Sequence, residues 1–384
     1  MGTDDWVAAL SLSEETAETV RTQFEHSEYR GLTYRHLSNA RHGVERGTAV
    51  VDGEVVRGFP SIPRALVLEP AVEAHFDGPV TIEEKLNGYN VRVARLDGIP
   101  DENGEPAADE QVLAFTRSGY ICPYTTSKVR DLLEPGTFFD DYPELMLCGE
   151  LVGPENPYTA HDYPEVASAG VSVFDVRNRV TGEPLSVERR RELCEEYDFS
   201  QVPSFGTHDP ERATTAAFDA IEDLDERGRE GVVLKSADGR TLVKYTTSFT
   251  HRDDLAYAFS LPFDYGRDFV FARIIREVFQ AVEFEESDAE VRERAQKLGE
   301  AIVEPAVETI REVRAGNDVG EAHTVRDEPD VVEELLVHLE NMGITMQIQD
   351  DHREGHERVV TFQKISEATR DNAQNYFDGQ LLDE

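Results

Sequence analysis

Hydrophobic and polar positions alternate over short stretches in the middle of the chain. Such runs of β-branched and aromatic residues, separated by Gly, Pro, Asn and Asp, predict strands joined by turns. Two stretches with helical spacing, 186–197 and 213–227, interrupt them. The pattern therefore predicts a β-rich α+β domain over residues 66–250. The expected strands are 79–83, 90–96, 111–116, 145–152, 171–176, 231–234 and 241–245.

The hydrophobic period changes to that of a helix after about residue 250. Apolar residues from Phe269 to Val282 fit one helical face, and a second helix begins near Ala289, meets Pro305 and resumes with Val307. We expect a helical domain over 251–325. The pattern alone leaves open whether the apolar faces pack on the parent domain or on a second subunit.

The two ends of the chain form smaller units. A helix opened by Ser13, over about 12–28, and Arg-rich hairpins from Arg30 to Arg57 predict an N-terminal module over 1–65. The C-terminal segment 326–384 predicts an α+β domain. Its expected elements are a helix from Pro329 to Met342, a hairpin of 344–348 with 359–364, and a closing helix from about Glu367.

The charge composition is that of a salt-adapted protein. The sequence has 38 Lys and Arg against 78 Asp and Glu, a net charge of −40, and only six of the cations are lysine. At about 1 M salt the Debye length is roughly 3 Å, so an acidic surface stays hydrated without strong self-repulsion. The overall acidity therefore does not exclude nucleic acid, and local clusters of Lys and Arg carry the information.

Cysteine and histidine usage favours a reducing compartment without a structural metal. Cys122, Cys148 and Cys194 are odd in number and never form a Cys-x-x-Cys pair. No basic leader or membrane-length apolar run is present, so we expect a cytoplasmic protein that does not enter a membrane. His352 and His356 form a His-x-x-x-His pair in a charged hairpin, which we interpret as a solvated turn.

Three of the six lysines lie in motifs suited to phosphate chemistry. The strongest motif is Glu84-Lys85-Leu86-Asn87-Gly88-Tyr89-Asn90-Val91-Arg92, in which an Asn-Gly turn between strands presents Lys85. Taken alone, this motif is typical of an ordinary turn. It is followed in order by further strand-associated motifs. They are Thr116-Arg117-Ser118-Gly119, Cys148-Gly149-Glu150-Leu151-Val152-Gly153, Val173-Phe174-Asp175-Val176, Glu230-Gly231-Val232-Val233-Leu234-Lys235 and Val243-Lys244-Tyr245.

This ordered set resembles the covalent nucleotidyltransferase superfamily of ATP-dependent ligases and messenger-RNA capping enzymes. The segments Glu84 to Arg92 and Gly149-Glu150-Leu151-Val152-Gly153-Pro154-Glu155-Asn156-Pro157-Tyr158 look more closely like the archaeal homodimeric ATP-dependent RNA ligase family. The resemblance covers about Thr81 to Thr246. It implies an antiparallel β-rich, ATP-grasp-like ligase domain, and it implies that the helices after Phe269 form a homodimer interface.

The nucleophile motif departs from the superfamily pattern at two positions. Asn87 and Asn90 occupy the places where Asp and Arg are usual, a departure that matches the archaeal RNA ligases. Arg92 is one candidate to replace the missing Arg contact to the nucleotide. A DNA ligase or capping enzyme would also continue after Lys244 into an OB domain of short strands, whereas this chain continues into helices.

The resemblance implies that Lys85 attacks the α-phosphorus of ATP and forms a lysyl-AMP phosphoramidate. The attack needs a free amine, whereas an ordinary lysine is protonated at neutral pH. Lys235, Lys244 and a bound Mg²⁺ would disfavour the ammonium form and stabilise charge that develops on the phosphate. Solvated strand lysines are the alternative, which is less common in a chain that otherwise prefers Arg.

The remaining motif residues acquire nucleotide-binding roles from the resemblance. Glu150 and Glu230 would hold the ribose hydroxyls or the metal, Mg²⁺ or Mn²⁺, and their flanking glycines allow close approach of a ligand. Phe174 would stack on adenine, although a core aromatic is an equal alternative on burial grounds. Arg117 would contact the ribose or an incoming 5′-phosphate, and Glu83 would read the adenine amino group. Asn87, Asn90 and Arg92 complete the expected nucleotide contacts.

The sequence thus predicts an ATP-dependent RNA ligase. Its partners would be RNA with 5′-phosphate and 3′-hydroxyl ends, single-stranded DNA being an alternative, and a second copy of the chain. Ligation of DNA, capping-type transfer, and a catalytically silent RNA- or nucleotide-binding homologue are the rival hypotheses. The sequence does not distinguish between possible RNA substrates, nor between joining within and between molecules.

Overall fold

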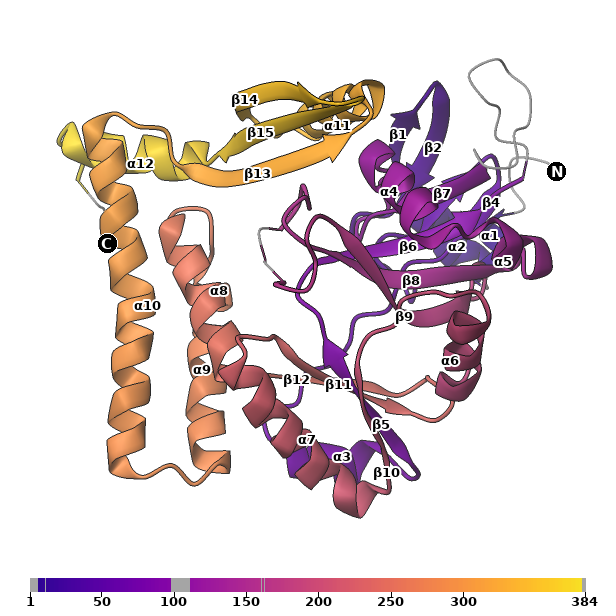
Figure 1. The fold of residues 1–384 in the computed structure, drawn as a ribbon, viewed down its shortest axis with the longest axis horizontal. Helices are drawn as coiled ribbons and strands as arrows, with labels where there is room; N and C mark the ends of the chain where they lie inside the picture. The colour runs from indigo at the N-terminus through magenta and orange to yellow at the C-terminus, as the bar shows by residue number, and fades with distance from the viewer. Residues whose placement is uncertain (1–5, 11, 98–110, 160, 162, 382–384) are drawn as a thin grey trace.

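The computed structural model describes residues 6–10, 12–97, 111–159, 161 and 163–381. They form an α+β fold with four antiparallel sheets, as the sequence predicted. In Figure 1 the β-rich part lies to the right, a column of helices lies to the left, and the C-terminal sheet bridges the top of both. Within these ranges, no helix is long and apolar enough to cross a membrane.

The N-terminal module is a four-stranded meander with two short helices packed on it. Ser13 caps the second helix by accepting a hydrogen bond from the Thr16 amide. Trp6 and Phe24 meet edge to face, 5.1 Å apart, in the module's own apolar core. The elements are α1 (Trp6–Ala9), α2 (Glu14–Arg21), β1 (Glu25–Tyr29), β2 (Leu32–His36), β3 (Ala49–Val51) and β4 (Glu54–Val56).

Two four-stranded sheets follow, and all seven strands expected between residues 66 and 250 are present. One sheet has the order β7-β6-β8-β9 and the other β10-β5-β11-β12. The strand bounds are β5 (Val80–Lys85), β6 (Tyr89–Arg95), β7 (Val112–Phe115), β8 (Leu145–Val152), β9 (Gly170–Asn178), β10 (Ser204–His208), β11 (Gly231–Ser236) and β12 (Leu242–Thr246).

Helices cover the outer face of each sheet. Because side chains alternate across a strand, one face of β5, β11 and β12 is apolar and packs on α3 and α7, while the other face is free for chemistry. The helices α4 to α6 cover the other sheet in the same way. Their bounds are α3 (Leu68–His75), α4 (Pro123–Leu133), α5 (Gly136–Asp141), α6 (Val187–Glu196) and α7 (Pro210–Glu226). The sequence pattern predicted α6 and α7 but not α3, α4 or α5.

The Asn-Gly segment that follows Lys85 is not the turn of a hairpin. The strands β5 and β6 belong to different sheets, so residues 86–88 cross from one sheet to the other. A Cβ atom on Gly88 would lie 2.5 Å from the Leu151 carbonyl oxygen and 2.7 Å from Val152 Cγ1, so the crossing has room for glycine alone. Lys85 therefore ends a strand at the seam between the two sheets.

Three helices form the column after β12. They are α8 (Ser248–Ser260), α9 (Arg267–Glu283) and α10 (Asp288–Ala315), and α10 begins with a capping box of Ser287 and Glu290. The expected interruption at Pro305 is wrong, because α10 continues through it. Proline removes one backbone hydrogen bond, and packing of the helix on α8 over its C-terminal half offsets that loss.

The C-terminal elements match the predicted helix, hairpin and closing helix. They are β13 (Gly320–Asp327), α11 (Pro329–Asn341), β14 (Met346–Glu354), β15 (Glu357–Ile365) and α12 (Glu367–Phe377). The strand β13, which pairs with β15, contains the expected boundary between residues 325 and 326. We therefore propose to draw that boundary before Gly320. The unit packs on α4, where Lys128 lies 3.3 Å from Asp327.

Candidate active site

A cavity of about 270 Å³ lies between the two large sheets, at the seam where β5 gives way to β6. Its floor is set by strand register: Asn90 lies opposite Glu150 on one sheet, and Lys85 lies opposite Gly231 on the other. Since directly opposite residues on neighbouring strands point to the same face, both sheets direct polar side chains into the space between them. Residues more than 150 positions apart in the chain are thus brought together.

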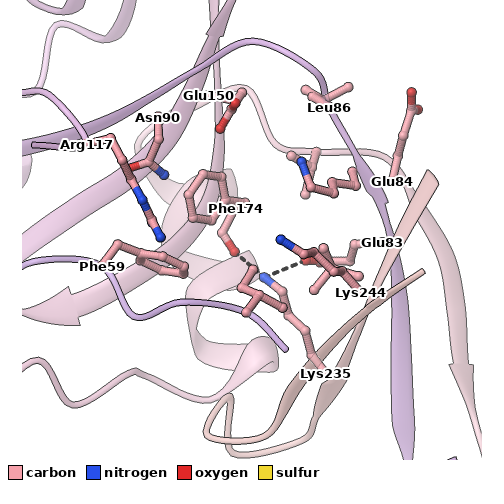
Figure 2. Close-up of a pocket in the computed structure, with 14 residues that line it drawn as sticks. Phe59, Glu83, Glu84, Leu86, Asn90, Arg117, Glu150, Phe174, Lys235 and Lys244 are labelled. Atoms are coloured by element: carbon pink, nitrogen blue, oxygen red, sulfur yellow. Dashed lines mark hydrogen bonds and ion pairs between the residues drawn. The ribbon is translucent and has the colours of Figure 1, made fainter. Parts of the chain in front are cut away.

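Most of the expected site residues line this cavity, as Figure 2 shows. They are Glu83, Lys85, Asn90, Arg117, Glu150, Phe174, Lys235 and Lys244. Glu230 lies beside this set, because its Oε2 atom is 2.6 Å from Lys85 Nζ. The prediction had grouped these residues by motif, and the structure places them around one cavity.

Glu83 is the buried anchor of the cavity. Its carboxylate lies 2.8 Å from Lys235 Nζ, and it also pairs with Arg190 and Arg191. Burial alone would raise the pKa of Glu83, but the adjacent Lys235 and Arg190 charges outweigh it and lower the pKa to about 2. Glu83 therefore stays ionised, and its negative charge holds Lys235 in place.

Aromatic rings form one wall of the cavity. Lys235 Nζ donates a hydrogen bond to the Phe174 carbonyl oxygen at 2.5 Å, and Phe59 meets the Phe174 ring edge to face at 5.1 Å. Phe174 is only half-buried, so its ring is available to a ligand in the cavity. This geometry suits a flat aromatic ligand held between an apolar wall and a polar floor.

Two carboxylates and several cations surround Lys85 at the cavity mouth. Burial raises the pKa of Glu150 to about 7, and the nearby Lys85 charge only partly opposes this. Burial also lowers the pKa of Lys244 to about 8, with the positive charges of Arg64 and Lys85 acting in the same direction. These shifts are typical of groups gathered for chemistry rather than for stability.

Two residues of the expected set do not face the cavity. Arg92 is fully buried, and its guanidinium donates to the carbonyl oxygens of Arg57, Gly47 and Thr116 at 2.7 to 2.9 Å. Both Nη atoms are used by the backbone and the side chain is fully buried away from the cavity, so the expectation that Arg92 contacts the nucleotide is wrong. Asn87 instead donates its backbone N–H to the Tyr163 hydroxyl oxygen at 2.6 Å. It shapes the nucleophile loop from outside the cavity.

Several cavity residues were missed by sequence reasoning. Phe59 and Ile62 come from the segment before α3, and Val202 and Val233 complete the apolar wall. Phe59, Ile62 and Val202 are isolated apolar residues in loops and carry no local signal, whereas Val233 lies on the predicted strand β11, so the fold alone shows that these residues meet. Arg64 was also missed; its backbone forms a β-bridge with Lys244.

The donor set at the mouth fits a divalent cation that is shared with phosphate. Glu150 and Glu230 both lie near Lys85, while the described ranges hold no group of three His, Cys, Asp or Glu able to bind a metal alone. Mg²⁺ is commonly held by one or two carboxylates together with phosphate oxygens and water. The two glutamates fit that role.

Two family models match the chain. The RNA ligase model matches residues 78–246, and a model described as Ligase Pab1020 C-terminal region matches residues 257–380. The first match spans the two sheets around the cavity and the second spans the helical column and the C-terminal unit. Together they cover every element from β5 to α12 apart from α8, whose last residues alone fall within the second match.

Similar proteins extend over the whole chain. An uncharacterised protein, MJ0414, from Methanocaldococcus jannaschii is 38% identical, covering 97% of this chain and 94% of that one. A solved archaeal ATP-dependent RNA ligase is 38% identical with a TM-score of 0.89 and full coverage of both chains. A candidate ATP-dependent DNA ligase from Aquifex aeolicus is 26% identical with a TM-score of 0.86, covering 97% of this chain and all of that one.

Proposed function

Because the chain belongs to the family of archaeal ATP-dependent RNA ligases, we propose that it joins RNA ends through an AMP bound covalently to Lys85. The observation that carries this proposal is the position of Lys85. It ends β5 at the cavity mouth, its Nζ is 2.6 Å from Glu230, and a ring-binding wall with Phe174 lies behind it. A nucleophile, a proton acceptor and a nucleotide-sized cavity thus coincide.

In the first step the Lys85 amine attacks the α-phosphorus of ATP. A P–N bond forms as the P–O bond to the leaving pyrophosphate breaks, and Glu230 is placed to accept the Nζ proton. Lys244, on β12 of the same sheet, supplies positive charge to the phosphate. Adenine would stack on Phe174 and Glu83 would stay an acceptor for its amino group, because the Glu83 carboxylate is ionised.

In the later steps AMP passes to the RNA 5′-phosphate, and the 3′-hydroxyl of the other end attacks that phosphate and releases AMP. Arg117 lines the cavity opposite Lys244 and offers a planar, bidentate donor for a phosphate. Burial lowers the pKa of Arg117, and the neighbouring Arg46 charge adds to that effect, yet a guanidinium keeps its charge at neutral pH. A fixed cation for the incoming 5′-phosphate is thereby supplied.

We assign the divalent cation, Mg²⁺ or Mn²⁺, to Glu150 and Glu230. When bound, it would polarise the α-phosphate and offset negative charge on the leaving group. Because burial raises the pKa of Glu150 to about 7, this carboxyl would ionise most readily when a cation or the ribose hydroxyls are present. A dependence of activity on divalent metal is therefore expected.

We also propose that two copies associate through the helical column. The exposed apolar side chains on α9 include Phe271, Val278 and Val282, with 60%, 51% and 74% of their surface exposed. A surface of this kind commonly marks a protein contact. Light scattering should give twice the monomer mass, and Val282→Glu should reduce it to the monomer mass. The three cysteines are free and buried, which fits the proposed cytoplasmic location.

The decisive experiment is covalent labelling with α-³²P-ATP and Mg²⁺ in molar KCl, followed by addition of 5′-phosphorylated RNA or DNA. Wild type should become labelled and RNA should discharge the label into joined product. Lys85→Ala should remain unlabelled. Lys297→Ala, which removes an exposed lysine paired with Glu293 on α10, should behave as wild type.

The alternatives give different results in the same experiment. A folded wild type that binds ATP without label would be a silent binding homologue. If DNA alone discharges the label, the lysyl-AMP mechanism stands but the substrate is DNA and not RNA. That outcome would agree with the similarity to the Aquifex aeolicus protein.

A further inference from the structure

The chemical face of the β10-β5-β11-β12 sheet extends beyond the cavity toward the helical column. Lys85, Gly231 and Thr246 lie in one row across three strands, so their side-chain positions point to the same face. With strands about 4.8 Å apart, Thr246 lies roughly 10 Å from Lys85. Gly231 places no side chain between them, and only glycine fits there, since a Cβ would overlap the Tyr245 carbonyl oxygen and lie 2.7 Å from Thr246 Cα.

At the far end of this row lies a group of cations without carboxylate partners. Arg64 donates a hydrogen bond to Thr246 Oγ1, and its backbone forms a β-bridge with Lys244. Arg276, on α9, lines a small recess together with Arg64 and Thr246. Across the described ranges, neither Arg64, Lys244 nor Arg276 forms an ion pair, and the Arg276 Nη1 atom is buried without a hydrogen-bond acceptor.

Unpaired cations are unexpected in this chain, which has 78 acidic residues for 38 basic ones. The carboxylates nearby are already used: Glu230 pairs with Lys85 at 2.6 Å, and Asp254 pairs with Arg273 at 2.8 Å. Burial and the positive charges of Arg64 and Arg273 together lower the pKa of Arg276 to about 10. Such mutual repulsion is costly unless an anion relieves it.

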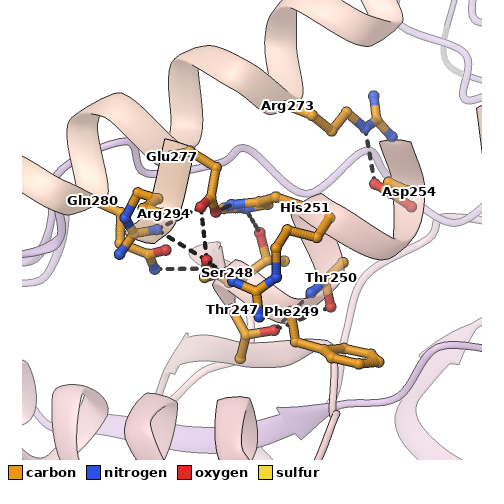
Figure 3. A network of polar contacts seen from close by, with 12 residues as sticks. Thr247, Ser248, Phe249, Thr250, His251, Asp254, Arg273, Glu277, Gln280 and Arg294 are labelled. Carbon is orange, nitrogen blue, oxygen red and sulfur yellow. Dashed lines mark hydrogen bonds and ion pairs between the residues drawn. The ribbon is translucent and has the colours of Figure 1, made fainter. Parts of the chain in front are cut away.

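A buried relay fixes the position of Arg64. Thr246 Oγ1 lies 2.8 Å from His251 Nε2, and His251 Nδ1 lies 2.6 Å from Glu277 Oε1 (Figure 3). Burial lowers the pKa of His251, so its ring is neutral and carries one N–H. That hydrogen sits on Nδ1 and donates to Glu277, which leaves Nε2 to accept from the Thr246 hydroxyl.

The Thr246 oxygen is then free to accept from Arg64, so each of the three hydrogen bonds that link Arg64, Thr246, His251 and Glu277 has one donor and one acceptor. Glu277 is itself held by the Ser248 hydroxyl at 2.7 Å and by Arg294 at 2.5 Å. Side chains from α8, α9 and α10 thereby set the orientation of Arg64 beside Lys244. A fully connected buried network of this kind makes the position of its terminal group rigid.

We propose that Arg64 and Arg276, together with Lys244, bind the pyrophosphate portion of ATP, and that Glu277 and His251 are positioning residues for Arg64. This inference rests on the proposed function, because it assigns the leaving group of the Lys85 reaction. The adenine wall lies inside the cavity at Phe174, and the unpaired cations lie past Lys85 on the side of α9. A triphosphate that runs from one to the other presents its α-phosphorus to Lys85.

Pyrophosphate binding predicts a selective defect. We would compare Arg64→Gln, Arg276→Gln and Glu277→Gln with wild type in three assays. The first measures formation of Lys85–AMP at increasing ATP concentrations. The second adds inorganic pyrophosphate to purified Lys85–AMP and measures the ATP formed, and the third measures joining of pre-adenylated RNA without ATP. The first two should fall about tenfold or more in Arg64→Gln and Arg276→Gln, the effect of losing a charged hydrogen bond. The third should be unchanged.

Glu277→Gln should show the same selectivity with a smaller loss, and Arg64→Lys should recover part of the activity. Arg240→Gln, which breaks an exposed ion pair with Glu183 at the other end of the β11–β12 hairpin, should match wild type in all three assays. Unchanged response to pyrophosphate in both Arg64→Gln and Arg276→Gln would overturn the proposal. Equal losses in the third assay would also overturn it and would assign these cations to RNA phosphates or to folding. Wild type that never forms Lys85–AMP would instead refute the proposed function.

Discussion

The Lys85 ammonium lies 2.6 Å from the Glu230 carboxylate although 145 positions separate them in the chain. Their proximity follows from the register of β5 and β11, which sets Lys85 opposite Gly231, the residue after Glu230. A shift of this register by one residue would turn Lys85 to the apolar face. The surroundings of the proposed nucleophile are therefore specified by sheet pairing rather than by its own motif.

Glu230→Gln should slow formation of Lys85–AMP by about 100-fold, because the amide cannot accept the Nζ proton and no longer helps to hold a cation. Single-turnover labelling with α-³²P-ATP measures this rate. Glu183→Gln, which removes an exposed carboxylate, is the matched control and should label normally. Labelling of Glu230→Gln at the wild-type rate would remove Glu230 from the chemistry.

Glu83→Gln should destabilise the protein by about 3–5 kcal/mol, because it leaves Lys235 and Arg190 buried without a counter-charge. The loss can be measured by urea unfolding in high salt. Glu165→Gln is a suitable control, since Glu165 pairs with Arg229 but is 56% exposed, and it should cost less than about 1 kcal/mol. A small loss for Glu83→Gln would mean that water enters the site and solvates the cations.

Much of the architecture could be predicted from the sequence. Alternation over residues 79–83, the apolar run 231–234 and the helical spacing after Phe269 follow directly from which faces are buried. The missed helices have different causes. For α4, half of the buried residues are Thr or Tyr, so a hydrophobic pattern is weak there. The short helix α5 has too few turns to show a period.

The candidate site was predicted as a set of motifs but not as a geometry. Arg92 lies in the nucleophile motif, yet its side chain supports the backbone, because strand alternation and depth decide where it points. Arg64 and Phe59 reach the site from a loop with no motif of its own. Local sequence indicates which residue types are unusual, whereas long-range pairing determines which of them meet.

Gly88→Ala should impair the nucleophile loop. The new Cβ would lie 2.5 Å from the Leu151 carbonyl oxygen, which is backbone and cannot move away without disturbing β8. We expect a loss of about 1–3 kcal/mol in stability and a slower first step, measured by thermal unfolding and by labelling. At Gly78 a Cβ would meet nothing within 4 Å, so Gly78→Ala is the control and should be neutral. Equal behaviour of both variants would show that the crossing is loosely packed.

Stability should fall in mild acid because of His338. Burial lowers the pKa of its imidazole to about 4, whereas in the unfolded chain it is near 6.5. Between these values the unfolded state binds the proton and the folded state does not, so stability is complete above pH 6.5 and declines as pH falls to about 4. His338→Gln should flatten this part of the profile in urea unfolding from pH 7 to 4. His26→Gln, in the exposed β1 strand, should leave the profile as in wild type.

Folding and activity should both require molar salt. The net charge of −40 creates repulsion that dilute buffer does not screen, since the Debye length is about 30 Å at 0.01 M and about 3 Å at 1 M. Thermal unfolding and Lys85 labelling, followed from 0.1 to 3 M KCl, should rise together. Sucrose at matched osmolality is the control, because it stabilises compact states without screening charge. Full activity in dilute buffer would contradict the salt-adapted interpretation, and equal rescue by sucrose would show that screening is not its cause.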